Sequence, residues 1–241
     1  LINGQPHSVV IRDLKTKQLQ VEPADHVVAN VPVQNLVQLL GEQVETVPAL
    51  QGYRRRVDKL PQGSAAFVVY LGVKQAAIPE DCPPHLQFLY DYDGPSGENN
   101  SLFVSVSHPG DGRAPDGCAT IIASSFVDLR NWWRSSTDYK ALKDQYTREA
   151  IARLGQFFDL NPDHLIHVEA ATPRTFANFT ARDQGIVGGI GQRVATFGPF
   201  GFANRTPIKK LWLVGDSTHP GEGTAGVSYS ALTVSRQIME V

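Results

Sequence analysis

The stretch LWLVGDSTHPGEGTAGV, residues Leu211–Val227, decides the fold of this chain. Its first four residues are apolar and predict a short buried strand. Asp216 stands at the end of that strand, glycines fill the turn that follows, and a helix is predicted from about residue 224 to 240. The apolar stripe of that helix consists of Val227, Ala231, Val234 and Ile238.

Each part of this strand–turn–helix segment has a use in binding a nucleotide. Glycines let a ligand approach the backbone, and the free N–H groups at a helix start favour negative charge. The carboxylate of Asp216 can accept hydrogen bonds from the ribityl hydroxyls of a flavin. The helix start near Gly226 and Val227 then faces the ring edge that becomes charged on reduction. From spacing alone, an ordinary strand–turn–helix connection without a ligand is an equally good interpretation.

Two parts of the segment, Leu213–Gly223 and Gly226–Ala231, resemble the C-terminal flavin-binding signature of the phytoene desaturase-type FAD enzymes. That family includes carotenoid desaturases, carotene cis–trans isomerases and carotenoid ketolases, and it is related to the amine oxidases. Within this family, the amino-acid sequence from Gly221 onward is most similar to that of a C-3′,4′ carotenoid desaturase. Ala225 stands where many members have proline, and Ala231 where many have glycine.

The resemblance implies FAD as the cofactor, with its ring and ribityl chain at this turn. The implied cofactor-binding residues are Gly215, Asp216, Gly221, Gly223, Thr224, Ala225, Gly226 and Val227. The sequence identifies no catalytic side chain, because the flavin itself carries the chemistry.

The resemblance also implies an α/β fold made of two domains. Pieces of an FAD/NAD(P)-binding, GR2-type Rossmann-like domain are expected at residues 1–48 and 185–241. They flank a substrate-binding α+β domain, with a mostly antiparallel sheet, at residues 49–184. Looser similarity covers residues 24–30, 172–176 and 185–191.

Apolar patterns predict the remaining elements. Four runs joined by short polar loops predict strands at 66–71, 85–90, 101–106 and 119–126. Such short spacers favour antiparallel pairing, because parallel strands need long crossovers. Apolar residues that recur at three- and four-residue steps predict a helix over 137–158, with Thr137 and Asp138 at its start. A strand at 165–170 is predicted to follow it in the sequence.

The N-terminal region is predicted to be mainly β structure. Residues 8–22 form a hairpin, in which Leu19–Glu22 alternates like a half-buried strand. A buried strand at 26–31 and a short helix at 33–40 follow.

The family's other FAD motif, GxGxxG after an N-terminal strand, is missing from the sequence. Gly185–Gly191 is dense in glycine but follows no clear strand, so we interpret it as a loop near the flavin ring. The adenine and pyrophosphate sites are therefore expected upstream of Leu1, in an N-terminal part of the same domain. This chain alone is expected to bind FAD weakly and to be inactive.

Composition excludes several classes of function. The formal net charge of −2 gives no basic face for a nucleic acid. No apolar run approaches the roughly 20 residues that span a bilayer. Cys82 and Cys118 stand apart from each other and from any histidine cluster, which favours a reduced, cytoplasmic protein without a metal.

Other side chains have two interpretations each. His219 is a turn residue or a neighbour of the cofactor, and His108 is a loop residue. Trp132–Trp133, between two arginines, suits a membrane interface or core packing equally. Arg54–Arg56 is interpreted as a solvated face. The acidic residues Asp91, Asp93 and Glu98 are interpreted as a solvated loop.

The resemblance implies an oxidoreductase of carotenoid biosynthesis that desaturates a long lipophilic polyene by hydride transfer to flavin. So insoluble a substrate implies a hydrophobic tunnel and peripheral contact with a membrane surface. The alternatives are a carotene cis–trans isomerase that uses reduced FAD, a carotenoid ketolase, and a truncated, non-catalytic remnant.

Overall fold

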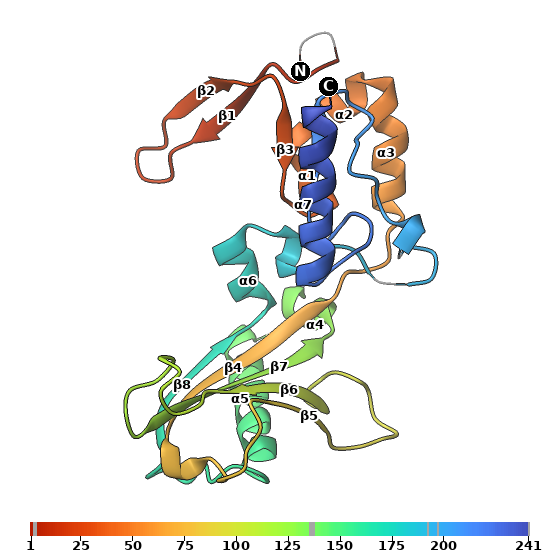
Figure 1. Cartoon of the computed structure of the whole chain (residues 1–241). Helices are drawn as coiled ribbons and strands as arrows, with labels where there is room; N and C mark the ends of the chain where they lie inside the picture. The colour runs from red at the N-terminus through yellow and green to blue at the C-terminus, as the bar shows by residue number, and fades with distance from the viewer. Residues whose placement is uncertain (2–3, 135–137, 192, 197, 241) are drawn as a thin grey trace. The chain divides into compact units, whose positions relative to one another are not determined.

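The structure is a computed structural model that describes residues 1, 4–134, 138–191, 193–196 and 198–240. The chain divides into two compact units, unit 1 (Leu1–Gly63 with Gly188–Val241) and unit 2 (Ser64–Val187) (Figure 1). These boundaries lie beyond the predicted ones at 48/49 and 184/185. The helix α3 (Pro48–Asp58) belongs to unit 1 because it buries Leu50 and Val57 in the core of that unit.

Unit 1 contains a hairpin, a parallel strand pair and helices. Its strands are β1 (Ser8–Arg12), β2 (Leu19–Pro23), β3 (Val27–Ala29) and β9 (Leu211–Leu213). Its other helices are α1 (Val33–Leu40), α2 (Gln43–Thr46), α7 (Thr224–Met239) and the 3₁₀ turn η3 (Gly198–Phe200). The hairpin β1–β2 is antiparallel, whereas β3 and β9 are parallel, with Val28 opposite Trp212.

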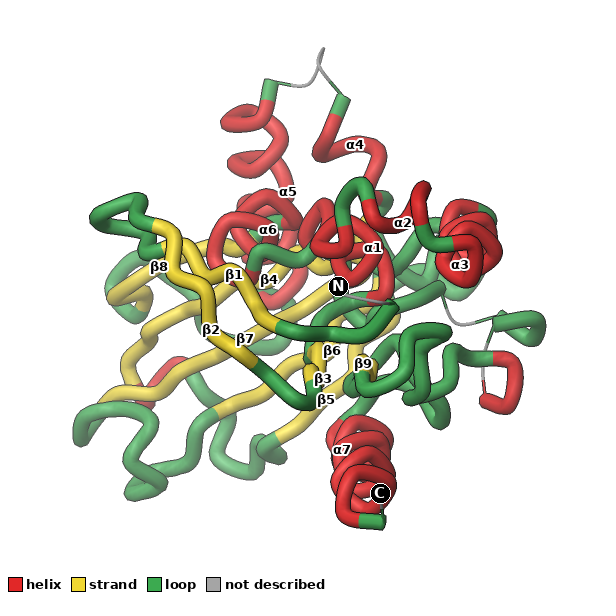
Figure 2. Tube along the Cα trace, turned by 90° about the horizontal axis from the view of Figure 1, so that it is seen from above, coloured by secondary structure: helices red, strands yellow, loops and turns green. Residues whose placement is uncertain are grey.

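Alternate side chains of β9 serve two different cores, as the pleat of a strand requires. Leu211 and Leu213 pack with residues of α1, including Val33. Trp212 and its successor Val214 pack against Val234 of α7. Figure 2 looks along α7, beside the strand that it covers. The predicted strand–turn–helix segment is therefore held on both faces.

The hairpin is present as predicted, but the expectation that Leu19–Glu22 is half-buried is wrong. Every residue of β2 is exposed, and none of them belongs to a core of the described residues. Alternation shows that one face of a strand suits burial, but it does not say whether another element covers that face.

Unit 2 is built on one five-stranded sheet in the order β5-β6-β7-β4-β8, antiparallel at each pairing. The strands are β4 (Ala65–Lys74), β5 (His85–Leu89), β6 (Ser101–Val106), β7 (Cys118–Val127) and β8 (Leu165–Ala171). The helices are α4 (Leu129–Trp133), α5 (Tyr139–Leu154) and α6 (Pro173–Thr180), with the 3₁₀ turns η1 (Gln75–Ala77) and η2 (Asp183–Gly185). The prediction of a mixed α/β fold with mostly antiparallel sheets is confirmed.

One face of this sheet packs against α5. Phe67, Val69 and Leu71 alternate along β4 into the same core as Ala150 and Leu154 of α5. The start of α5 is Tyr139, and the Asp138 carboxylate caps it by accepting from the N–H of Ala141 at 3.0 Å. Thr137, the other residue predicted there, lies outside the described residues.

The two adjacent tryptophans point in different directions. Trp132 is fully buried and its ring stacks on Phe67 at 6.2 Å between centroids, which confirms core packing for this residue. Trp133 is 41% exposed and donates from its indole nitrogen to the carbonyl of Gln184 at 2.9 Å.

The acidic residues near position 95 do not all behave as a solvated loop. Asp91 and Asp93 are exposed, as predicted. Glu98 is half-buried instead, and its carboxylate accepts from the backbone N–H of Asp128 and from the Tyr146 hydroxyl. Burial beside a tyrosine and the end of β7 gives this carboxylate a structural role that its sequence neighbours do not reveal.

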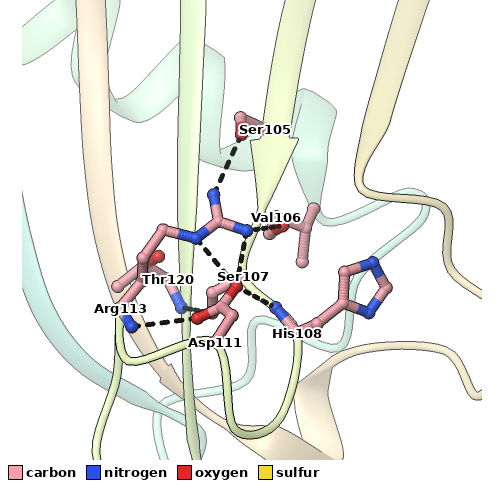
Figure 3. Close-up of polar contacts among 7 residues, drawn as sticks. All are labelled: Ser105, Val106, Ser107, His108, Asp111, Arg113 and Thr120. Carbon is pink, nitrogen blue, oxygen red and sulfur yellow. Dashed lines mark hydrogen bonds and ion pairs between the residues drawn. The ribbon is translucent and has the colours of Figure 1, made fainter.

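A polar cluster holds the loop between β6 and β7 (Figure 3). The Asp111 carboxylate accepts from the N–H of His108 at 2.7 Å and from the N–H of Arg113 at 2.9 Å. The Arg113 guanidinium pairs with Asp111 and donates to the carbonyl of Val106 at 3.0 Å. His108 is thus a loop residue, as predicted.

None of the described helices combines the length and the apolar character needed to cross a membrane.

Candidate functional site

The candidate site lies where the parallel strands β3 and β9 end. Because parallel strands share one carboxyl edge, Asn30 after β3 and Gly215 after β9 are neighbours. Val214 extends the pairing by donating its N–H to the carbonyl of Ala29 at 3.0 Å. Two helices, α1 and α7, begin beyond this edge.

Two close approaches at this edge require glycine. Gly215 has φ of +106°, and a Cβ there would lie 2.8 Å from the side-chain oxygen of Asn30. Gly189 has φ of +70°, and a Cβ there would lie 2.6 Å from the Asp216 carboxylate and 2.7 Å from the backbone nitrogen of Ser217. Gly189 therefore lies directly against the Asp216 carboxylate and the backbone that follows it.

A buried hydroxyl fixes the turn after β9. Ser230 of α7 is fully buried, and its oxygen accepts from the N–H of Gly215 at 3.1 Å. The amide of Asn204 donates to the same oxygen at 2.8 Å, and the Thr218 hydroxyl lies 2.8 Å from it. This network ties the turn to the helix that follows it.

The same turn also supports the start of α1. Ser217 is fully buried, and its hydroxyl oxygen accepts from the N–H of Val33 at 3.1 Å. Val33 is the first residue of α1, where a helix leaves N–H groups without intrahelical partners.

The start of α7 is open. Its N-terminal cap is Gly223, with φ of +90°, and no side chain caps the helix. Thr224 and Ala225 are exposed, so the first N–H groups of a 16-residue helix face the surface. Such a helix start favours oxygen atoms that carry negative charge.

Two carboxylates lie close to this helix start. Asp216 is half-buried at the end of β9. Partial desolvation, followed by the negative charge of Asp216, raises the pKa of the Glu222 carboxyl above its usual value. The local field therefore opposes a second negative charge beside Asp216.

The donors and acceptors fit the ribityl and ring edge of a flavin. The Asp216 carboxylate suits hydroxyl donors, and the open N–H groups of α7 suit a ring oxygen. The cavity that Asp216 lines, with Thr218 and Gly221 among others, measures only about 10 Å³, which is room for about one water molecule. A flavin ring at this site must therefore lie over the exposed helix start.

The eight predicted cofactor-binding residues lie along one continuous turn and helix start. They are Gly215, Asp216, Gly221, Gly223, Thr224, Ala225, Gly226 and Val227. His219, within the same turn, is exposed, donates its N–H to the carbonyl of Phe202 at 3.0 Å, and rests edge-to-face on Tyr229.

The glycine-dense stretch 185–191 is shared between the two units. Gly185 packs against the backbone of Pro173 and Ala177 in unit 2. Gly188 and Gly189 instead belong to unit 1, where Gly188 packs against the side chain of Glu222. Within unit 1, this second part contacts the candidate site through Glu222 and Asp216.

Several contributors were not foreseen from the sequence. Asn30 and Ser230 contact Gly215 of the turn, and the Ser217 hydroxyl bonds to Val33 of α1. Gly189, which contacts Asp216, lies within the glycine-dense stretch that the sequence predicted to be near the site. No group of three or more histidine, cysteine or acidic residues among the described residues suits a metal ion.

Two of the three predicted surface arginines occupy different environments. Arg54 is exposed and pairs with Glu45 and Asp58. Arg56 is also exposed, but it donates to the carbonyls of Phe200 and Gly201 and lies 4.0 Å above the ring of Phe202. The solvated face is confirmed, with Arg56 bridging to the 3₁₀ turn η3.

Comparison with known proteins agrees with this geometry. The chain is 31% identical over 178 residues to a prolycopene isomerase of an Oncidium hybrid cultivar and 30% identical over 176 residues to that of Arabidopsis thaliana. These matches cover 70% of this chain but only 30% and 29% of the relatives. A zeta-carotene-forming phytoene desaturase of Myxococcus xanthus is 27% identical over 197 residues, 77% of this chain and 37% of the relative.

The fold also matches a solved structure. An oxidoreductase from Methanosarcina mazei superposes with a TM-score of 0.60 at 17% identity, over 98% of this chain and 47% of that protein. No protein-family profile matches the chain. The chain spans about a third of the length of its curated relatives. It belongs to the carotenoid oxidoreductase family that contains prolycopene isomerase and phytoene desaturase.

Proposed function

We propose that this chain forms part of an FAD-dependent oxidoreductase of carotenoid biosynthesis, which desaturates a long polyene in the manner of a C-3′,4′ desaturase. The observation that carries the proposal is the open start of α7 beside Asp216, within the signature turn. In this proposal unit 1 is part of a GR2-type FAD-binding domain and unit 2 is the substrate-binding domain.

Several groups of the turn and of α7 have a task in this function. The Asp216 carboxylate accepts hydrogen bonds from the ribityl hydroxyls, and the N–H groups of Thr224 and Ala225 donate to the ring edge. Ser217 and Ser230 hold the turn in place from the buried side. When bound, FAD supplies a hydride acceptor for the polyene.

The open face of the sheet in unit 2 supports a lipophilic substrate. Phe103, Ile122 and Phe126 are 50%, 37% and 57% exposed. Their strand neighbours are buried against α5, so all three point to the opposite face. Three large apolar side chains on one sheet face suit contact with another apolar surface. We propose that the polyene lies along this face.

The second candidate is a cis–trans isomerase that uses reduced FAD. Two observations favour it: the relatives at 30–31% identity are prolycopene isomerases, and the desaturase is less similar, at 27%. Both reactions need the same flavin turn and the same apolar face. The nature of the product therefore separates them.

Product analysis tests the proposal. The protein, expressed in full, is incubated in detergent micelles with FAD and a monocyclic carotenoid, and separately with chemically reduced FAD and an acyclic poly-cis carotene. Desaturation removes two hydrogen atoms and shifts absorption to longer wavelength, whereas isomerisation leaves the mass unchanged. An unchanged carotenoid in both reactions, with FAD bound, would contradict both candidates.

The apolar face has its own test. Phe103→Ser with Phe126→Ser should raise KM for the carotenoid at least tenfold and leave the flavin spectrum unchanged. Leu14→Ser, at a 78% exposed leucine of unit 1, is the control and should leave KM unchanged. An equal KM for the parent, the double variant and Leu14→Ser would show that the polyene does not bind along this face.

A further inference from the structure

A second pocket of unit 1 lies at the opposite end of β9 from the flavin turn. It measures about 310 Å³ and is open to the surface. Its lining includes His26, Arg205, Ile208, Lys209, Lys210 and Trp212. Lys210 directly precedes β9, whereas Gly215 follows its other end. The pocket is thus separate from the candidate cofactor site.

A hydrogen-bonded loop shapes this pocket. The hydroxyl of Thr206 donates to the carbonyl of Leu211 at 2.8 Å and accepts from the N–H of Ile208 at 3.1 Å. The N–H of Leu211 donates to the carbonyl of Ile208 at 3.1 Å. Lys209 and Lys210 are held inside this closed loop, so their positions relative to the pocket are set by the backbone.

Three cations gather at the pocket without a carboxylate partner in the described part of the chain. No salt bridge there involves Arg205, Lys209 or Lys210. Arg205 is oriented by Gln237, whose side-chain oxygen accepts from its Nε at 3.1 Å. In a protein of net charge −2, three unpaired cations around one pocket suit an anionic ligand.

The floor of the pocket is apolar. Ile208 and Trp212 are buried, and the indole N–H of Trp212 donates to Nδ1 of His26 at 3.2 Å. The rings of His26 and Trp212 stack, and the guanidinium of Arg205 lies 5.5 Å from the Trp212 ring centre. The one polar group of the indole is therefore already bonded, so Trp212 contributes no free donor to the pocket.

We propose that this pocket binds the phosphate head group of an anionic lipid, with the cations on the phosphate and the aliphatic part against Ile208 and Trp212. Apolar floor and cationic rim together match an amphiphile better than a free ion, which would leave the floor unused. The inference does not depend on flavin binding. It gives the proposed membrane contact of this protein a defined place.

Vesicle co-sedimentation tests the inference. The protein should bind vesicles of phosphatidylcholine with phosphatidylglycerol and should stay in solution with phosphatidylcholine alone. Each basic side chain near an anionic surface contributes about fivefold to partition, so Arg205→Gln with Lys209→Gln should lower binding roughly thirtyfold. Binding should fall steeply with added salt.

A matched variant separates the pocket from general charge. Arg55→Gln with Lys59→Gln removes the same charge from exposed positions on and next to α3 and should leave vesicle binding nearly unchanged. An equal loss in both double variants would overturn the assignment to the pocket. Soluble glycerol phosphate that binds the pocket as tightly as the vesicles do would assign the pocket to a free phosphate and overturn the lipid. Because FAD spectra are not read, failure here leaves the proposed function untouched.

Discussion

The hydroxyl oxygen of Ser217 accepts a hydrogen bond from the N–H of Val33 at 3.1 Å, and both residues are fully buried. One end of this bond lies in the turn that precedes α7, and the other is the first residue of α1. A single bond thus joins the turn after β9 to the start of α1 at the carboxyl edge of the parallel pair. The turn after β9 therefore also supports the start of α1.

Replacing this hydroxyl should destabilise unit 1. Ser217→Ala leaves the N–H of Val33 buried and unpaired, which costs about 1–2 kcal/mol. Urea unfolding monitored by circular dichroism measures the change. Ser228→Ala, at an exposed position of α7, is the control and should stay within about 0.5 kcal/mol of the parent. Equal effects of the two substitutions would show that the bond contributes nothing.

The contact between Gly189 and Asp216 gives a second prediction. Gly189→Ala adds both a left-handed backbone penalty and a clash with the Asp216 carboxylate. Gly198→Ala carries the same kind of penalty, at φ of +60°, but its Cβ would meet no atom within 4 Å. The Gly189 variant should lose about 1–3 kcal/mol more than the Gly198 variant. Indistinguishable unfolding curves of the two variants would show that the contact between Gly189 and Asp216 does not affect stability.

Much of this site follows from local sequence. The helices predicted at 33–40 and 224–240 are present as Val33–Leu40 and Thr224–Met239, because their apolar repeats are uninterrupted. The long helix α3 was not predicted, since Gly52 and three consecutive arginines dilute its apolar repeat.

Contacts between distant residues were beyond such reasoning. Neither the approach of Gly189 to Asp216 nor the bond between Ser217 and Val33 has a periodic signal, because each depends on how separate segments pack. The prediction that β2 is half-buried failed for the same reason. The residue pattern of a strand shows which face suits burial, but not whether another element covers that face.

The raised pKa of Glu222 predicts a pH dependence. A carboxyl whose pKa is higher in the folded state contributes stability that is fully present below its unfolded value, about 4.3, and is lost as pH rises through the folded value. Glu222→Gln should therefore stabilise the protein at pH 7.5 and have little effect at pH 3.5, in urea titrations at both. The control, Glu22→Gln on exposed β2, should show no such difference. Stabilisation that is equal at the two pH values would contradict the raised pKa.

The loop cluster in Figure 3 predicts the opposite behaviour. Hydrogen bonds from Arg113, above all from its side chain, and from the N–H of His108 lower the pKa of Asp111 to about 2. The loop should therefore stay ordered above the usual aspartate pKa of about 3.9 and loosen as pH falls towards 2. The amide resonances of His108 and Arg113 should titrate with a midpoint near 2. Asp111→Asn should abolish this titration, and a midpoint near 4 in the parent would show that the bonds are not formed.

A flavin titration of the complete protein, followed by absorbance and fluorescence, tests the central claim most directly. Asp216→Ala removes charge-assisted hydrogen bonds worth about 1.5–3 kcal/mol, so its Kd for FAD should rise roughly tenfold to a hundredfold. Asp25→Ala, at an exposed aspartate of the same unit, should bind FAD like the parent. A parent protein that remains colourless with added FAD, or an Asp216→Ala variant with unchanged Kd, would contradict the assignment of this turn to a flavin.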